Sequence, residues 1–387
     1  MKICLINNLY EPYAIGGAEQ VVKMTFEGLK ESGHNVFIIT TRPISEKAAR
    51  ERSIYYLPSL QFVFRKLPKF LRLIWHVVDF TDPVTCFRIK KILARERPDV
   101  VMTHNLVGIG FLLPLIIRNL RIRHVHVLHD IQMLHPSGLL IYGRENVLNG
   151  FAAKIYQFAC RKLTASAEIV ISPSNWLISE HTKRGFFSSS RRVILPNPVP
   201  RYVTMTDEKK RDNNEFKLLY VGQIEPHKGI QFLIDAFAHL TDKNRNFSLT
   251  FIGSGPDDSR YLSFISRRNI RNIEFKGRIP NEEVKRLMPA FDCLVVPSLC
   301  HENSPTVIYE AASLGLAVIA SRIGGISEWV RDLGGILFVP GSRTDLARKL
   351  IWASKNPLKL KEMANKAKSR SERYTLPVYI DKLTQLL

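Results

Sequence analysis

Short, almost wholly apolar segments recur along this chain, and longer stretches with helical spacing separate them. The first such segment is Lys2–Asn7, after which the apolar residues between Val22 and Leu29 recur with the period of an α-helix. Gly33 is suited to end that helix, because glycine readily adopts the left-handed conformation found just after helices. The pattern therefore predicts a strand, a helix and a second strand at Val36–Thr40.

Apolar runs without alternation are typical of strands that are buried on both faces of a parallel sheet. The first half of the chain contains four more of them, at Val100–Thr103, Val125–Leu128, Ile169–Ser172 and Val193–Leu195. A polar, highly charged segment at Arg201–Glu215 marks the predicted domain linker. The second half repeats the pattern at Lys217–Val221, Leu249–Ile252, Ile273–Phe275, Cys293–Val296, Ala317–Ala320 and Ile336–Val339. The sequence therefore predicts an α/β fold with two doubly wound parallel-sheet domains.

Length and composition agree with this division. A chain of 387 residues is longer than one ordinary core requires, and we place the two domains at residues 1–200 and 201–370. Five cysteines without a CxxC pair indicate reduced thiols rather than a disulfide framework or a zinc ribbon. The opening MKICLINNLY is typical of a first strand and not of a signal peptide. No apolar run approaches the ~20 residues of a membrane-spanning helix, so we expect a cytoplasmic protein.

The formal net charge of +21 implies anionic partners such as nucleotides, phospholipid head groups or nucleic acid. Within Ile54–Arg97, basic and aromatic residues are interleaved, which is the composition of an element that lies on a membrane surface. The alternative is a core segment with a solvated basic face. If the segment docks, the protein works at the inner face of the cell membrane and contacts it through Arg65, Lys66, Lys69 and Arg72. No nucleic-acid-binding motif accompanies the charge, so nucleic acid is not an expected partner.

A candidate anion site follows the strand predicted at Cys293–Val296. Ser304 and Pro305 are typical of the N-cap and the first residue of a helix, and Gly315 is suited to end it. Backbone N–H groups in the first turn of a helix bind anions such as a diphosphate. The residues that would supply these groups are Thr306, Val307 and Ile308.

Two glutamates lie on either side of this predicted helix start. Glu302 precedes the cap, with Asn303 next to it, and can reach hydroxyl groups on the far side of a bound phosphate. Glu310 lies further along the helix and can accept two hydrogen bonds from a ribose diol. Two carboxylates around an anion site suit a nucleotide sugar. The alternative is an ordinary turn between a strand and a helix, with both glutamates facing solvent.

The segment "PSLCHENSPTVIYEAASLGLAVIAS", with its Glu302-x7-Glu310 spacing, resembles the donor motif of family-4 retaining glycosyltransferases (glycosyl transferases group 1) of the GT-B fold. The resemblance continues in order along the chain. It covers Gly16–Gln20 (GGAEQ), Val127–Asp130 (VLHD), Ser172–Trp176 (SPSNW), Pro196–Val199 (PNPV), Tyr220–Ile230 (YVGQIEPHKGI), Ile252–Pro256 (IGSGP), Phe275–Val284 (FKGRIPNEEV) and Gly324–Val330 (GGISEWV). One such motif means little, whereas the ordered set is specific.

This resemblance implies two Rossmann-like domains that face a cleft, with the acceptor in the first, the nucleotide-sugar donor in the second, and a C-terminal helix at residues 371–387 that crosses back to the first. It implies metal-independent transfer of a hexose, with retention, from a UDP- or GDP-linked sugar to a glycan or a polyprenyl- or lipid-linked acceptor. The product would enter cell-surface polysaccharide or glycolipid. No cofactor is expected.

The resemblance also implies roles for individual residues. His129 would contact the transferred sugar. Lys228 would pair with the diphosphate as negative charge builds on it. Together with Glu302, these two residues are the expected catalytic residues. The family usually has an arginine where this chain has Gln223, so one positive charge is missing. Further donor contacts are implied for Gly16, Gly17, Gly253, Arg278 and Ile279, beside Asn303, Ser304, Pro305, Thr306, Val307 and Glu310. Taken singly, Lys228 is better explained as a surface lysine and Gly16-Gly17 as a simple turn.

The histidines of "RHVHVLHD" invite a metal interpretation. Alternation places His124 and His126 on one strand face and His129 beyond the strand end, so we expect no metal site. After the preceding strand, His104 and Asn105 are candidates for the acceptor cleft, although His104 is equally consistent with a structural role.

Two alternative functions are consistent with parts of the sequence. One is a nucleotide-sugar epimerase of the same fold, which would turn over without an acceptor. The other is a non-catalytic basic protein that binds RNA or membrane and ignores nucleotide sugars. A dinucleotide-dependent dehydrogenase is not indicated, because no GxGxxG follows any predicted strand.

Overall fold

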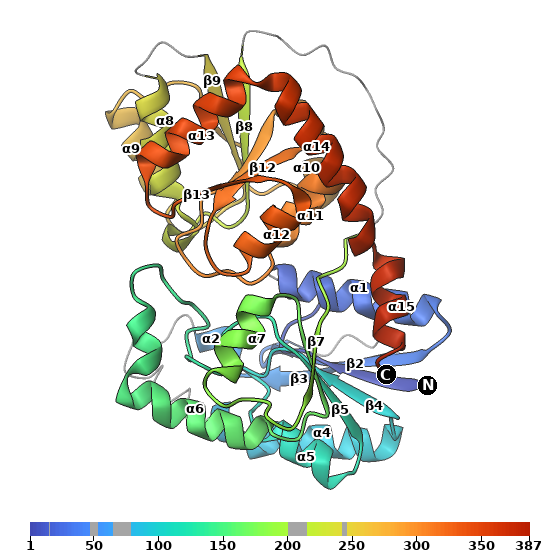
Figure 1. Ribbon diagram of the computed structural model, residues 1–387. Helices are drawn as coiled ribbons and strands as arrows, with labels where there is room; N and C mark the ends of the chain where they lie inside the picture. The colour runs from blue at the N-terminus through green and yellow to red at the C-terminus, as the bar shows by residue number, and fades with distance from the viewer. Residues whose placement is uncertain (15, 47–52, 65–78, 200–214, 242–245) are drawn as a thin grey trace. The chain divides into compact units, whose positions relative to one another are not determined.

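The computed structural model describes residues 1–14, 16–46, 53–64, 79–199, 215–241 and 246–387 (Figure 1). The chain divides into two compact units. Unit 1 comprises Met1–Leu139, Glu145–Pro198 and Leu376–Leu387, and unit 2 comprises Leu140–Arg144 and Val199–Thr375. Each unit has its own sheet and its own buried core.

Unit 1 contains a seven-stranded parallel sheet in the order β3-β2-β1-β4-β5-β6-β7. Its central strands are buried on both faces, as their unbroken apolar sequences require. The strands are β1 (Lys2–Ile6), β2 (Asn35–Pro43), β3 (Ile54–Ser59), β4 (Val100–Thr103), β5 (Arg123–Val127), β6 (Ile169–Ser172) and β7 (Arg191–Ile194).

Helices cover both faces of this sheet, with α1 and α15 on one face and α4, α5 and α6 on the other (Figure 1). The C-terminal helix α15 packs directly on α1: a Cβ atom added to Gly28 would lie 2.6 Å from Cγ1 of Ile380. The helices are α1 (Gly17–Glu31), α2 (Gln61–Phe64), α4 (Pro83–Glu96), α5 (Leu113–Asn119), η1 (Glu145–Asn149), α6 (Phe151–Thr164), α7 (Asn175–Thr182) and α15 (Leu376–Thr384).

Unit 2 contains a six-stranded parallel sheet in the order β10-β9-β8-β11-β12-β13. Its strands are β8 (Phe216–Val221), β9 (Phe247–Ile252), β10 (Ile273–Phe275), β11 (Cys293–Val296), β12 (Ala317–Ser321) and β13 (Ile336–Phe338). Its helices are η2 (Pro226–Lys228), α8 (Ile230–Thr241), α9 (Asp258–Arg267), α10 (Asn281–Leu287), η3 (Met288–Ala290), α11 (Thr306–Ser313), α12 (Ile326–Leu333), α13 (Arg343–Lys355), α14 (Pro357–Ser371) and η4 (Glu372–Tyr374).

The predicted α/β class with two Rossmann-like parallel sheets is confirmed. One strand was not predicted: β3 lies inside the basic aromatic segment Ile54–Arg97. Several aromatic residues of that segment are packed, since Tyr56 is buried and Phe80 stacks on Phe111 with ring centroids 5.1 Å apart. Arg65, Lys66, Lys69 and Arg72 lie outside the described residues. Within the described part of the chain, no helix is both long enough and apolar enough to cross a membrane.

Candidate functional site

The residues singled out from the sequence lie in the loops that follow parallel strands, or in the first turns of the helices that come after these loops. In unit 2 these loops follow β8, β9, β10 and β11, and in unit 1 they follow β1, β4 and β5. Ligands of open parallel α/β sheets bind at this edge, outside the carboxyl ends of the strands. Each unit therefore presents one group of candidate residues at the edge where binding is expected.

An ion pair joins the loops after β8 and β11 in unit 2. The Nζ atom of Lys228 lies 2.6 Å from Oε2 of Glu302, and the two side chains are only 22% and 17% exposed. Gly229 makes this approach possible, because its φ is +80° and an added Cβ atom would lie 2.0 Å from the carbonyl oxygen of Pro297. Two of the three residues expected to be catalytic are thus in direct contact.

Both members of this pair are charged in the native protein. Burial disfavours both charged forms, but the opposite charges outweigh it: the pKa of Lys228 is raised by Glu302, and the pKa of Glu302 is lowered by Lys228. A hydrogen bond from Ser298 also lowers the pKa of Glu302. The site therefore presents a fixed ammonium group whose charge is balanced by one carboxylate.

Helix α11 begins one residue later than the sequence indicates, so the prediction of Ser304 as N-cap is wrong. Pro305 is the N-cap, with extended backbone angles, and the Ser304 hydroxyl lies 2.7 Å from the hydroxyl of buried Tyr309. The N–H of Ile308 donates to the carbonyl of Pro305. The first-turn amides that have no acceptor within the helix are therefore those of Thr306 and Val307.

Glu310 projects from the second turn of α11 and is half-buried. Burial raises the pKa of Glu310, while the positive charge of Lys285 on α10 lowers it in part. Lys285 is buried, and its Nζ atom donates to Glu282 at 2.8 Å. Sequence analysis missed Lys285, because its position beside Glu310 depends on how α10 packs against α11. Its only sequence signal was its place just after the FKGRIPNEEV motif.

Glycine allows two neighbouring loops of unit 2 to touch. Gly253 has a φ of +141°, and an added Cβ atom would lie 1.8 Å from the carbonyl oxygen of Gly222. The N–H of Gly253 donates to the carbonyl of Gly277 in the third loop, so the three loops are tied together. Gln223 follows directly in the first loop, whereas Arg278 is exposed and Ile279 packs partly against the core.

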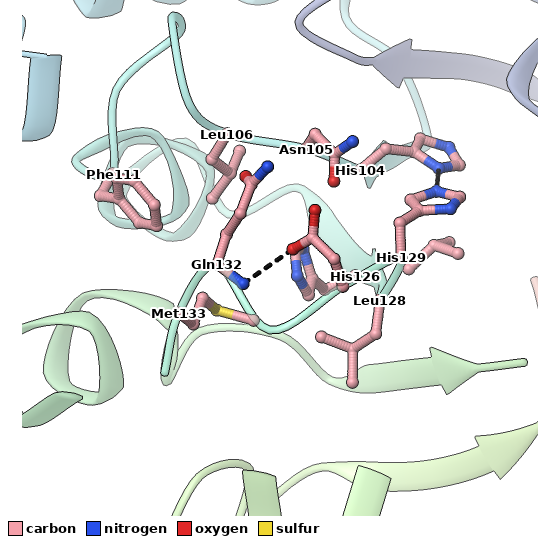
Figure 2. Close-up of a pocket in the computed structure, with 11 residues that line it drawn as sticks. His104, Asn105, Leu106, Phe111, His126, Leu128, His129, Gln132 and Met133 are labelled. Atoms are coloured by element: carbon pink, nitrogen blue, oxygen red, sulfur yellow. Dashed lines mark hydrogen bonds between the residues drawn. The ribbon is translucent and has the colours of Figure 1, made fainter. Parts of the chain in front are cut away.

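In unit 1, His104 and Asn105 after β4 and His129 after β5 line one pocket, together with Asp130 and Gln132 (Figure 2). Nδ1 of His104 lies 2.8 Å from Nε2 of His129, and the two rings stack with centroids 5.1 Å apart. His104 is buried, and its Nε2 atom has no hydrogen-bond partner among the described residues. The predicted acceptor residues and the histidine predicted to contact the sugar are thus brought together.

Burial keeps these histidines neutral. It lowers the pKa of His129 to about 4 and the pKa of His104 well below its usual value. His124 and His126 share one strand face as predicted, and each ring contacts Oγ1 of Thr103 at 2.8 Å. In the described part of the chain, no cluster of histidine, cysteine and acidic side chains has the arrangement of a metal site.

Asp130 is a pocket residue that sequence analysis quoted within a motif but did not single out. Its Oδ1 atom accepts from the N–H of Gln132 at 2.7 Å. Burial, with a smaller effect from Glu19, raises the pKa of Asp130 to about 7. Glu19 accepts from the N–H of Gly16, the N-cap of α1, at 2.8 Å, and Gly17 is the first residue of that helix. The Gly16-Gly17 loop therefore lies near this pocket of unit 1.

Sequence profiles of two families match nearly the whole chain. Residues 15–201 match the profile described as Glycosyltransferase Family 4, and residues 204–370 match the profile described as Glycosyl transferases group 1.

Individual proteins also match over most of their length. An uncharacterized 42.6 kDa protein in the cps region of Klebsiella pneumoniae is 28% identical over 347 residues, which cover 88% of this chain and 90% of that protein. Alpha-monoglucosyldiacylglycerol synthase of Acholeplasma laidlawii is 25% identical, with 98% and 94% covered. The structure of Anabaena HepE in complex with UDP superposes with a TM-score of 0.75 at 18% identity, covering 100% of this chain and 99% of that one.

Proposed function

This chain belongs to the group 1 glycosyl transferases and has the GT-B fold, and we propose that it transfers a hexose from a nucleoside diphosphate to a glycan or lipid-linked acceptor with retention at the anomeric carbon. The observation that supports this most strongly is the Lys228–Glu302 pair, in which Glu302 lies in the loop that leads into α11. A charged ammonium group next to helix amides is the arrangement that a diphosphate leaving group needs.

We assign the donor to the loops of unit 2. The N–H groups of Thr306 and Val307 would bind diphosphate oxygens, and the ammonium group of Lys228 would neutralise the charge that accumulates as the glycosidic bond breaks. In this assignment Glu302 holds the lysine in place and accepts from hydroxyl groups of the sugar. Because helix amides and Lys228 supply the positive potential, the proposed reaction requires no divalent cation.

The ribose assignment rests on Glu310. Its carboxylate would accept two hydrogen bonds from a ribose diol. The positive charge of Lys285 would favour the ionised form of Glu310, which is the form that accepts both bonds. We propose uridine diphosphate as the first donor nucleotide to test, because the structural neighbour HepE was solved with UDP.

We assign the sugar and acceptor contacts of unit 1 to the pocket of Figure 2. A neutral His129, whose pKa is about 4, would donate or accept hydrogen bonds without bringing a charge to the reacting sugar. The contact with His104 would fix the orientation of the His129 ring. Asp130, whose pKa is about 7, would accept from an acceptor hydroxyl. The acceptor's proton would pass to the leaving phosphate, so the proposal requires no protein base.

The acceptor class is proposed from the relatives. The synthase of Acholeplasma laidlawii is named for a glycolipid product, which supports a lipid-linked acceptor. We accordingly propose that the protein acts on the cytoplasmic leaflet of a membrane.

A two-stage experiment tests the function. Thermal shift with UDP-, GDP-, ADP- and dTDP-sugars identifies the donor, and release of the nucleoside diphosphate is then measured with and without glycolipid and glycan extracts. Release that depends on the acceptor and ceases in Glu302→Gln supports transfer. Interconversion of nucleotide sugars without an acceptor would instead identify an epimerase, and indifference to every nucleotide sugar would refute the proposal.

A further inference from the structure

Helix α6 (Phe151–Thr164) in unit 1 has its apolar side on the outside. The fully buried residues of its inward face are small or polar, namely Ala153, Gln157, Cys160 and Thr164, and half-buried Tyr156 packs beside them on Phe80 and Phe111. Its outward face carries Phe151, Ile155 and Phe158, which are 83%, 56% and 55% exposed. A surface helix of a globular domain normally shows the opposite arrangement, because the apolar stripe faces the core. The outward stripe of α6 therefore requires a separate explanation.

The charged residues of α6 are all basic. Lys154, Arg161 and Lys162 flank the apolar stripe, and no acidic residue occurs between Phe151 and Thr164. The cationic groups of Arg161 and Lys162 lie 5.6 and 5.8 Å from the ring centroid of Phe158. Aromatic rings surrounded by long basic side chains are the composition of a helix that lies at a lipid interface.

Helix α4 repeats this composition on the same side of the sheet (Figure 1). Val84 and Phe87 are exposed on it, and Nζ of Lys91 lies 4.6 Å from the ring centroid of Phe87. Helix α5 packs against both α4 and α6, so the three helices form one layer. Arg88 and Lys90 add exposed positive charge to the α4 part of this layer.

We propose that this layer is a docking surface for an anionic phospholipid bilayer. We define the docking surface as Val84, Phe87, Lys91, Phe151, Lys154, Ile155, Phe158, Arg161 and Lys162. The aromatic and aliphatic side chains enter the interface between head groups and acyl chains, and the basic side chains pair with lipid phosphates. Phospholipid fits better than a protein partner, because cations alternate with apolar groups along both helices and no carboxylate of α6 would face the lipid phosphates.

The docking surface would hold the protein at the membrane that contains the lipid-linked acceptor of the proposed function. Docking itself does not depend on transfer activity. The docking surface also lies on a different part of the chain from the membrane contact that the sequence predicted. The sequence placed it within Ile54–Arg97, whereas only α4 of the docking surface belongs to that segment and α6 lies outside it. The inversion of α6 becomes visible only when its buried face is known.

The test is co-flotation of the full chain with vesicles of phosphatidylcholine alone and with phosphatidylglycerol added. Each basic residue near an anionic surface contributes about fivefold to the partition coefficient, so binding should require phosphatidylglycerol and weaken as salt rises. The triple variant Phe151→Ser, Ile155→Ser, Phe158→Ser should lower the partition coefficient about 100-fold or more. The double variant Lys154→Glu, Lys162→Glu should lower it by about 25-fold or more at low salt, because two fivefold contributions are lost and two repelled charges are added.

Matched controls are available in unit 2. Leu262→Ser with Leu358→Ser removes two exposed apolar side chains, and Lys361→Glu with Lys366→Glu reverses two exposed charges on α14. Both controls should bind vesicles within about twofold of the parent chain, since neither lies on the docking surface. Thermal unfolding of every variant establishes that it is folded.

Three outcomes would overturn the proposal: no binding to phosphatidylglycerol vesicles at low salt, equal binding by the triple α6 variant, or self-association of the parent chain that the same variant abolishes. The last outcome would make the stripe an interface between copies of this chain. Vesicle binding without any transferase activity would leave the docking surface intact and refute the proposed function instead.

Discussion

The ammonium group of Lys228 and the carboxylate of Glu302 lie 2.6 Å apart, although the two residues are 74 positions apart in the chain. Each reaches the pair from a different strand, β8 or β11, and these strands are neighbours in the sheet. The pair therefore assembles only when the sheet of unit 2 has formed.

Lys228→Ala should lower kcat by about 100- to 1000-fold and change donor affinity far less, because charge builds on the diphosphate in the transition state. Steady-state and single-turnover kinetics with the donor from the thermal-shift screen measure both quantities. Lys276→Ala is the matched control, since Lys276 pairs with Glu274 at 2.7 Å on the surface of the same unit. An effect on KM alone would mean that Lys228 binds substrate and transition state equally.

The stability that the Lys228–Glu302 pair provides should depend on pH in one direction only over the usual range. The pKa of Glu302 is lowered, so its contribution is present above pH ~4.3 and is lost as pH falls through the lowered value. The pKa of Lys228 is raised, so its contribution is lost only as pH rises above ~10.4. Calorimetry should show a constant difference in Tm between the parent chain and Glu302→Gln from about pH 5 to 9. A difference that grows in acid would contradict the assignment.

Glu310→Ala should weaken binding of the nucleoside diphosphate while the fold persists, because two hydrogen bonds to a carboxylate are lost, each worth ~1.5–3 kcal/mol. Isothermal titration calorimetry with UDP and GDP provides the measurement. Glu362→Ala, an exposed change on α14, should leave affinity unchanged. If Glu310→Ala left the affinity for the nucleoside diphosphate unchanged, the assignment of Glu310 as the ribose contact would be wrong.

Two carboxyl groups of unit 1, half-buried Asp130 and buried Asp79, both have a pKa raised to about 7 by desolvation, but only Asp130 lines the pocket. Asp79 accepts from the N–H of Gly108 with both oxygens. The acceptor KM should fall as pH rises through 7, because the ionised Asp130 accepts more strongly from a sugar hydroxyl.

Asp130→Asn should abolish that pH dependence and raise the acceptor KM about tenfold or more. Asp79→Asn should preserve it. Carboxyl ¹³C NMR on protein with labelled aspartate follows the titration of both carboxyl groups. Each variant removes one of the two titrating signals, which assigns the signals without reference to the kinetics. If Asp79→Asn rather than Asp130→Asn removed the pH dependence of KM, the proposed acceptor contact would be wrong.

Gly253→Ala should destabilise unit 2 by ~3 kcal/mol or more, because the added methyl group meets the Gly222 carbonyl oxygen at 1.8 Å and the backbone conformation is strained as well. Gly277→Ala is the matched control: its φ is also positive, at +67°, but no atom lies within 4 Å of the added carbon. It should cost only ~1–2 kcal/mol. Urea unfolding measures both, and equal costs would mean that the loops after β8 and β9 separate easily.

The strands were the most predictable part of this fold. Val100–Thr103, Ile169–Ser172 and Cys293–Val296 have the bounds that the sequence predicts, because a strand covered on both faces consists mainly of apolar residues. By contrast, β3 was missed. Its Ile-Tyr-Tyr-Leu sequence opens a segment rich in basic and aromatic residues, and that composition suggested a surface element instead of a strand.

The part of the candidate site that lies in loops directly after strands was predictable from the sequence. Lys228 and Glu302 were expected to serve one site, and they are in contact. The contribution of Lys285 was not predictable, because it depends on the packing of α10 beside Glu310. The apolar stripe of α6 was not predictable for a related reason, since helical periodicity identifies two faces but not which of them is buried.

Helix α15 has a consequence for biosynthesis. Tyr379 and Ile380 are buried in the core of unit 1, yet they leave the ribosome only after the whole of Val199–Thr375. The α1 surface that contains Gly28 thus remains exposed to solvent on the nascent chain until α15 has been synthesised. We expect unit 2 to complete its core first, so that the domain synthesised first is the last to mature.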